Sequence, residues 1–427
     1  MSDKTEQVAK IGGWTAFLHV GSKVQAVALM VSGAIIGGTS GVGAVTVMYG
    51  TALLAGSLAD FGVGTETMRF IASTPGRKEI DSALRTGARR SSIAFGLGAV
   101  AVALIGGRHE AASVVGILAG GATAASMTTQ LWAQGILYGL LRFRAASLTS
   151  GLLRAGLSLG LPMCAAVGMK AAGVLAYLAV METTIAIALV AAAARARRYA
   201  TNSESQGNGN RSTPHWLGVA ALTNVIINRS DTVIISMAAT TAVAGTYAVA
   251  SQVENAISTL ALIPAGALAA FVSRSKVANQ SVRTAKRLAN ISAGIAGAMG
   301  VLVVIVILSV GALGPEKLSA IGHGQQIAAI IICCLGAPMS AAGGVLLSAY
   351  VAVGQHKNLA SAWLVASALS VPCMLLGARL AAAPGASLGA LVRDAALLAI
   401  AKRLWRREQE QADSYDATES RLEIPAC

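Results

Sequence analysis

The chain has 427 residues, of which 55% are hydrophobic and only 12% are charged, and its mean hydropathy is +0.65. Soluble domains carry about 25% charged residues, so this composition excludes a soluble protein and indicates a polytopic membrane protein. The net charge of +14 would suggest nucleic acid as the partner of a soluble chain. Basic loops facing an anionic inner leaflet explain it better here, and few Lys and Arg are interleaved with aromatic residues. We therefore expect no nucleic-acid partner.

The chain begins with ten mostly polar residues, which lead into an apolar segment interrupted by His19 and Lys23. Because this segment lacks a cleavage site built from small residues, we interpret it as a retained first helix and not as a signal peptide. Runs of about 20 apolar residues can cross a bilayer as helices. The sequence contains twelve, at 12–37, 43–65, 91–107, 111–138, 146–168, 172–194, 215–240, 243–271, 288–313, 324–353, 358–378 and 384–402. It therefore predicts an all-α integral membrane protein with 12 transmembrane helices.

The segments between these spans alternate in charge. One set, which includes both termini, holds 25 Lys and Arg, whereas the other set holds four, Arg108, Lys170, Lys317 and Arg379. Segments rich in Lys and Arg stay in the cytoplasm, so the alternation places both termini there. The outer loops are then only a few residues long, which leaves little room for chemistry outside the membrane.

A hydrophilic Gly/Ser/Asn-rich stretch at 201–213 interrupts the apolar part of the chain. It is a predicted cytoplasmic linker between two six-helix lobes, at 1–200 and 214–405, and a cytoplasmic tail follows at 406–427. The segment 43–72 can be laid over 245–274 without a gap, because in both a short outer turn leads into a long helix that ends in a basic segment. Since six is even, two such lobes share one orientation and are related by an axis along the membrane normal.

The chain offers few motifs for a metal site or for catalysis. Its five cysteines show no CxxC or His/Cys spacing, so neither a disulfide framework nor a zinc site is predicted. No nucleophile elbow, P-loop, HExxH motif or paired carboxylate site stands out in the sequence. We therefore expect no enzymatic activity and no cofactor, with coupling to H⁺ or Na⁺ left open.

Charged residues inside the apolar spans are the candidates for function, because each costs roughly 2.5–3.5 kcal/mol to insert. At 1.5 Å per residue, Arg229, Asp231, Glu254, Arg393 and Asp394 all lie about 13–16 Å from the predicted outer end. This layer either lines a water-filled cavity or consists of ion pairs, Arg229 with Glu254 and Arg393 with Asp394. Adjacent residues point about 100° apart on a helix, so Arg393 or Asp394 should also reach another helix or the cavity.

The first half carries fewer such charges. Lys23 and Glu182 lie roughly 15–22 Å from the predicted outer end, whereas Asp60 lies nearer the cytoplasmic side. Lys23 either lines the cavity or pairs with Glu182. Arg154 is close enough to the inner surface for its side chain to snorkel there.

Three stretches of the sequence resemble motifs of the oligosaccharide flippase (Wzx-type polysaccharide transporter) family. This family belongs to the superfamily that also contains MATE drug exporters and lipid II flippases. The first stretch is similar to the family's first outer turn and second helix, the second to its passage across helices seven and eight, and the third to the last turn and last helix. They are Ser40-Gly-Val-Gly43 with Asp60-Phe-Gly-Val-Gly64 and Arg69; Asp231-Thr-Val-Ile-Ile235 with Ala244-Gly-Thr-Tyr-Ala248 and Pro264; and Ala352-Val-Gly-Gln-His-Lys-Asn358 with Gly385-Ala-Ser-Leu-Gly389.

The resemblance implies a two-lobed, V-shaped transporter of the bacterial plasma (inner) membrane that works by alternating access. Such proteins move polyprenyl-diphosphate-linked oligosaccharides outward for cell-surface polysaccharide assembly, and basic cavity residues meet the diphosphate. The expected partners are the lipid bilayer, the lipid-linked oligosaccharide and other polysaccharide assembly proteins. The candidate substrate-binding residues are Lys23, Arg229, Arg154 and Arg393. The candidates for charge pairing or ion coupling are Asp60, Glu182, Asp231, Glu254 and Asp394.

Two alternatives remain open at this point. A MATE-like cation-coupled drug or metabolite antiporter would suit the intramembrane acids Asp60, Glu182, Asp231 and Glu254. A membrane glycosyltransferase or polymerase is disfavoured, because the short outer loops hold no acidic pair.

Overall fold

The computed structural model describes residues 2–73, 76–106, 113–199, 215–229, 231–262, 278–312, 324–353 and 356–422. They are almost entirely helical, and the predicted linker at 201–213 lies outside them. The elements are α1 (Ser2–Asp60), α2 (Val63–Ser73), α3 (Arg77–Gly106), α4 (Val114–Gly139), α5 (Phe143–Ser158), α6 (Gly160–Ala166), α7 (Ala171–Ala196), η1 (Arg197–Tyr199), α8 (His215–Arg229), α9 (Asp231–Ala238), α10 (Thr241–Leu262), α12 (Ala278–Ala312), α14 (Gly324–Val353) and α15 (His356–Leu422).

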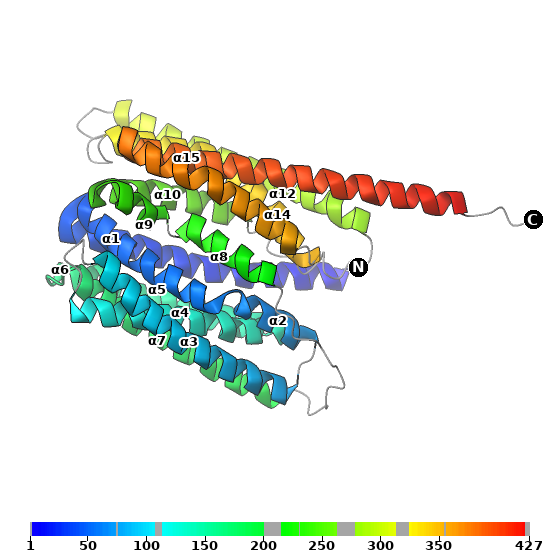
Figure 1. Ribbon diagram of the computed structural model, residues 1–427, viewed down its shortest axis with the longest axis horizontal. Coiled ribbons are helices and arrows are strands. Elements are labelled where there is room, and N and C mark those ends of the chain that lie inside the picture. The colour runs from blue at the N-terminus through cyan, green and yellow to red at the C-terminus, as the bar shows by residue number, and fades with distance from the viewer. Residues whose placement is uncertain are drawn as a thin grey trace, which may run out of the picture.

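The helices form two groups, which we call the N lobe (α1–α7) and the C lobe (α8–α15) (Figure 1). The buried core of the N lobe draws on residues between Ala28 and Ala196. The two cores of the C lobe draw mainly on residues between Ala220 and Trp405. Val47 of α1 is buried in one of these C-lobe cores, so α1 belongs to the interface between the lobes. Its contacts with α8, α9 and α10 join the two lobes.

Both α1 and α15 are helical hairpins that fold back at two residues. The backbone turns at Gly37 (φ −171°, ψ 35°) and Gly38 (φ 58°, ψ −138°) in α1. It turns in nearly the same way at Ala381 (φ −139°, ψ 25°) and Ala382 (φ 52°, ψ −135°) in α15. We call the end of the molecule with these turns the hairpin end, and the opposite end, where both termini lie, the termini end (Figure 1). The sequence predicts that the termini end is cytoplasmic.

Each predicted span overlaps a helix of the structure, but several differ from a single straight crossing. Among the described residues, seven helical stretches are long and apolar enough to cross a membrane, and two of these contain the hairpins. The predicted span 146–168 is divided into α5 and α6. The predicted span 215–240 contains α8 and α9, and Ser230 between them lies outside the described residues. The turn predicted as the first outer loop consists of only Gly37 and Gly38, and it is shorter than the sequence predicts. The count of twelve crossings stays a prediction.

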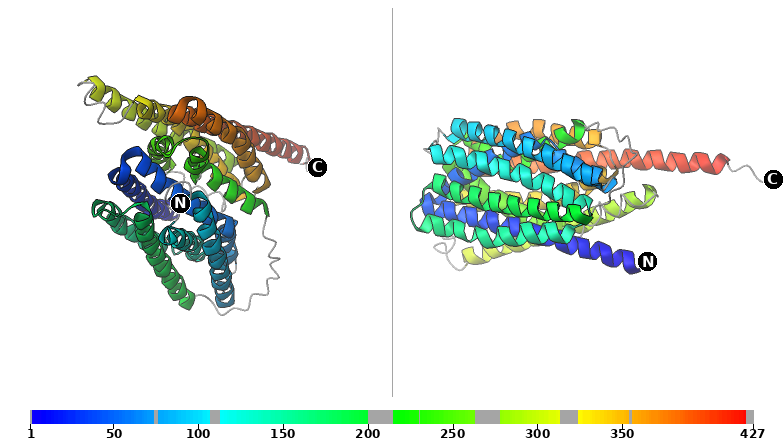
Figure 2. Two further views of the ribbon diagram at one scale, coloured as in Figure 1. Left: turned by 60° about the vertical axis from the view of Figure 1, so that its left-hand side comes forward. Right: turned by 90° about the horizontal axis from the view of Figure 1, so that it is seen from below.

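The second leg of α1, 39–60, corresponds closely to α10, Thr241–Leu262. Its first residue differs from that of α10 by 202 positions (39 to 241). This is the offset between the two segments that the sequence analysis superimposes. At the other end of the chain, the predicted tail continues the second leg of α15 as a helix to Leu422, which projects well beyond the rest of the molecule (Figures 1 and 2).

Candidate functional site

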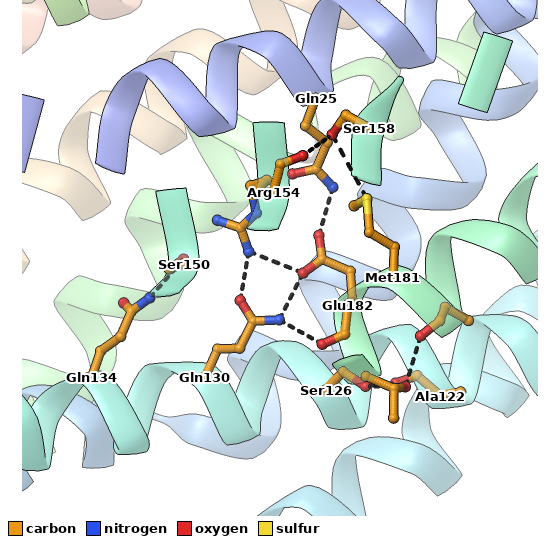
Figure 3. Close-up of polar contacts among 12 residues, drawn as sticks. Gln25, Ala122, Ser126, Gln130, Gln134, Ser150, Arg154, Ser158, Met181 and Glu182 are labelled. Atoms are coloured by element: carbon orange, nitrogen blue, oxygen red, sulfur yellow. Dashed lines mark hydrogen bonds and ion pairs between the residues drawn. The ribbon is translucent and has the colours of Figure 1, made fainter. Parts of the chain in front are cut away.

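The N lobe holds a buried polar network around Glu182 (Figure 3). The carboxylate of Glu182, on α7, is 0% exposed. It accepts hydrogen bonds from Gln25 Nε2 on α1 (2.5 Å), Gln130 Nε2 on α4 (2.7 Å) and Arg154 Nη2 on α5 (2.9 Å). Four helices of the lobe are thus joined at one carboxylate.

Arg154 is the cation of this network. Its Nη2 donates to both Gln130 Oε1 (2.5 Å) and Glu182 Oε2 (2.9 Å), and its side chain is only 12% exposed. The expectation that Arg154 snorkels to the inner surface was wrong, because Glu182 and Gln130 hold it inside the lobe. Its Nε–H is also buried, and it has no acceptor among the residues that the structure describes. The sequence offers two roles for Lys23, lining the cavity or pairing with Glu182, and the contacts shown for Glu182 come from Gln25, Gln130 and Arg154.

The C lobe holds a second network, centred on Arg393 of α15. Arg393 Nη2 donates to Glu254 Oε1 of α10 at 3.0 Å, and its Nε donates to Asp394 Oδ1 at 2.8 Å. All three side chains are nearly inaccessible. Gly336 of α14 leaves space for the carboxylates, because a methyl group built on it would lie 2.9 Å from Asp394 Oδ2. The predicted pairing of Arg393 with its neighbour and its reach to another helix are thus both present.

Asp231 stands at the start of α9, within the same layer of the C lobe. Its Oδ1 accepts the backbone N–H of Thr232 (2.8 Å), and its Oδ2 accepts the hydroxyl of Tyr247 on α10 (2.8 Å). Sequence reasoning missed Tyr247, although a signal was available. Tyr247 and Glu254 are seven residues apart and therefore share one face of α10.

Two candidates stand apart from these networks. Asp60 is buried at the end of α1, where its Oδ1 accepts the N–H of Gly64 (3.1 Å) and so caps the first turn of α2. Arg229 is the last residue of α8, and its side chain lies outside the described residues, so its predicted pairing with Glu254 is not described either. The carboxylate of Glu254 is held by Arg393.

A groove of about 500 Å³ runs between the lobes on the side where α1 faces α10. One wall is a stripe on the first leg of α1, and the others come from the α5–α6 junction and from the second half of α10. Its lining residues are Val20, Lys23, Val24, Val27, Ala28, Val31, Leu159, Pro162, Ala256, Thr259 and Leu260. Among these, Lys23 is the single charged side chain. The stripe from Val20 to Val31 extends about 16 Å along the helix axis.

A second cavity, of about 570 Å³, lies between α4 and α7. Its lining consists of alanines, Ser126, Thr129, Thr183, Ile187 and Val190, with no charged residue. It belongs to the N lobe alone and does not touch the interface between the lobes. We therefore regard the groove beside Lys23, not this larger cavity, as the candidate site.

No family model matches the chain, and no curated protein matches it. Solved structures do match. The MATE transporter VcmN of Vibrio cholerae in its bent form is 15% identical with a TM-score of 0.58, over 97% of this chain and 99% of that chain. A multidrug resistance MATE family transporter of the MOP superfamily is similar in its inward-facing conformation (14% identity, TM-score 0.62, 95% of this chain and 99% of that chain). An outward-facing conformation of such a transporter is similar too (12% identity, TM-score 0.63, 95% and 97%).

At these identities the likeness shows the fold. The chain has the all-helical, V-shaped, multi-span fold of the MATE transporters, which confirms the predicted fold class. The narrower resemblance to oligosaccharide flippases stays a prediction.

Proposed function

We propose that this protein moves a polyprenyl-diphosphate-linked oligosaccharide from the cytoplasmic to the outer leaflet by alternating access, for cell-surface polysaccharide assembly. The observation that carries the proposal is the groove between α1 and α10. Its walls are apolar apart from Lys23 and Thr259, and several of its valines and leucines are half exposed. Such walls suit a hydrocarbon chain better than a hydrated sugar or a hydrophilic drug.

Lys23 gives the groove its polarity. It lies nearer the termini end, whereas Val27 and Val31 continue the stripe toward the hairpin end. A lipid of the predicted cytoplasmic leaflet has its anionic headgroup at the termini end and its chain directed toward the membrane centre. A phosphate at Lys23 and a chain along the valine stripe therefore match this groove in both charge and direction.

The other basic candidates have different places in the proposal. Arg154 carries a buried Nε–H without an acceptor among the described residues, so it is the second proposed contact for phosphate. Arg229 is a third, on sequence grounds. Arg393 is held by two carboxylates, and we assign it, with Glu254 and Asp394, to pairing within the C lobe.

The test is surface glycan export by a strain that lacks this protein and is complemented with variants. A hydrogen bond to a charged group is worth about 1.5–3 kcal/mol, so Lys23→Ala should lower export about tenfold or more, while Lys23→Arg retains most of it. Lys402→Ala removes an exposed lysine outside the groove and should have no effect. Normal export by Lys23→Ala at equal protein amount contradicts the proposed role.

The role of the apolar wall of the groove can be tested with a matched pair of valine substitutions. Val27, in the groove, and Val301, on α12, are 60% and 59% exposed. Placing asparagine at either position adds the same polar group to an exposed face of a helix. Export should fall with Val27→Asn and stay unchanged with Val301→Asn. Equal effects of both variants would mean that the groove does not hold the chain.

A second candidate function is a cation-coupled drug or metabolite antiporter. It is favoured by the C lobe, where two carboxylates, those of Glu254 and Asp394, share one guanidinium, that of Arg393, and a third buried carboxylate, that of Asp231, accepts from Tyr247. Increased drug susceptibility of the deletion strain, with normal surface glycan, would support this function and contradict the first.

A further inference from the structure

The lobes touch at the hairpin end through two glycines, Gly43 of α1 and Gly245 of α10. A methyl group built on Gly43 would overlap the carbonyl oxygen of Thr241 and lie 3.1 Å from the backbone nitrogen of Gly245. One built on Gly245 would overlap the carbonyl oxygen of Thr39 and lie 2.8 Å from the nitrogen of Gly43. The backbone of the opposite lobe therefore fills the space where a Cβ would lie on each glycine, and neither position has room for a side chain.

This contact is reciprocal. Thr39 and Thr241 differ by 202 positions, as do Gly43 and Gly245, and this is also the offset between the second leg of α1 and α10. Equivalent atoms of the two helices thus exchange the same contact, as in a two-fold interface where one patch meets its own copy. Helix backbones that approach this closely gain van der Waals contact and Cα–H···O interactions, which need no side chain.

The interface changes character toward the termini end. One turn beyond Gly43, the side chain of Val47 is 0% exposed and packs into a C-lobe core. At the end of the same leg, the ring of Phe61 lies against Gly218 of α8. Beside these side-chain contacts, on the face between the first leg of α1 and α10, the lobes leave the groove. The glycine pair thus closes the hairpin end, and the space between the lobes lies on the other side of it.

We propose that the Gly43–Gly245 contact is the outer closure of the transport pathway. It separates when the lobes rock apart at the hairpin end, and the groove between α1 and α10 closes in exchange. The direction, outer against cytoplasmic, rests on the proposed function and its predicted topology, whereas the contact itself does not depend on the substrate. A packed contact without side chains has two discrete states, made and broken, which is what a closure needs.

The test measures whether a buried position behind the closure becomes reachable from outside. Val47→Cys is introduced into a chain whose natural cysteines are replaced, and intact cells are treated with a membrane-impermeant maleimide. Gly43→Ala should force the helices apart and raise labelling at position 47 about tenfold, and Gly245→Ala should do the same because the contact is reciprocal. Each change is made separately.

Matched controls come from glycines that have open space around them. A methyl group on Gly96 of α3 or Gly294 of α12 would meet nothing within 4 Å. Gly96→Ala and Gly294→Ala insert the same methyl into each lobe and should leave labelling at position 47 unchanged. Equal labelling in all four alanine variants would overturn the proposal.

A cross-link tests the closure without altering either glycine, in case their alanine variants do not fold. Thr39→Cys and Thr241→Cys, together in the cysteine-free chain, are treated with a short bifunctional thiol reagent or with its monofunctional analogue. The bifunctional reagent should lower glycan export about tenfold, and the analogue should leave it unchanged. Continued export by the cross-linked protein would show that the contact stays closed throughout transport, and the proposal would fail.

The two readouts separate this inference from the proposed function. Labelling at position 47 reports opening whatever the substrate is. If the alanine variants raise labelling but the deletion strain shows normal surface glycan, the closure stands and the proposed substrate falls.

Discussion

At the scale of single residues, both lobes bury a guanidinium against a carboxylate, but they neutralise it differently. In the N lobe, Arg154 and Glu182 balance each other, and two glutamines complete the hydrogen bonds of the carboxylate. In the C lobe, Arg393 faces Glu254 and Asp394, and Asp231 is held separately by Tyr247. The described part of the N-lobe network is therefore neutral, whereas that of the C lobe has an excess of carboxylates. Any coupling to protons or cations is better sought in the C lobe.

Removing one partner of the N-lobe pair should be far more costly than removing both. Glu182→Ala leaves Arg154 buried without its carboxylate, and such a loss costs about 3–5 kcal/mol of the free energy of unfolding. Replacing the pair by apolar residues of similar size, with Arg154→Met and Glu182→Leu together, should restore most of it. Thermal midpoints of the purified variants in detergent give the order. A double variant less stable than Glu182→Ala would show that the unpaired buried charge is not what makes the single variant costly.

At the scale of elements, the two hairpins use one backbone conformation with different residues. The second turn residue is Gly38 in α1 and Ala382 in α15, both at φ above 50° and ψ near −137°. Glycine adopts such angles without steric cost, whereas a residue with a Cβ is strained there. Helices beside the turns approach closely, with Gly33 against Val42 and Gly377 against Gly385. The strain at Ala382 thus follows from the tight turn that the closely packed legs require.

Ala382→Gly should therefore stabilise the protein. Relief of a positive φ at a residue with a Cβ is worth about 1 kcal/mol, and the greater freedom of glycine in the unfolded chain offsets part of that. Ala381→Gly is the matched control, because φ at Ala381 is −139° and favours no glycine. The thermal midpoint should rise for the first variant and fall or stay for the second. A fall in both would show that Ala382 is not strained.

At the scale of the whole molecule, the sequence predicts the architecture better than the contacts. The bilayer sets how long an apolar run must be and on which side basic loops stay. Run length and loop charge therefore predict the spans and the repeat without knowledge of how the helices pack. The partners of buried charges depend instead on how helices rotate and cross. Arg154 illustrates this. Its position near the end of a predicted span suggests snorkelling, but in the folded N lobe it forms an ion pair with Glu182. The break at Leu159 is different, because Gly160 and Pro162 beside it are residues that the sequence marks as helix breakers.

The predicted orientation of the molecule can be tested with two lysines. Lys170, before α7, lies at the hairpin end, and Lys402 lies in α15 toward the termini end; both are exposed. In a cysteine-free chain, Lys170→Cys should react with an impermeant maleimide on intact cells, and Lys402→Cys should react only after permeabilisation. The reverse pattern would place the termini outside and would reverse the assignment of the two ends.

The second leg of α15 continues beyond the C lobe as a helix, so a probe on its far end can report how the C lobe moves. Trp405 anchors the leg, because its indole Nε1 donates to the Leu346 carbonyl (3.2 Å) and its ring is buried in a C-lobe core. From there to Leu422 the helix extends about 25 Å. A rotation of the C lobe by about 10° moves the far end of this helix by roughly 4 Å relative to Trp405. A distance probe attached near Leu422 therefore reports the angle of the C lobe from a position outside the predicted membrane spans.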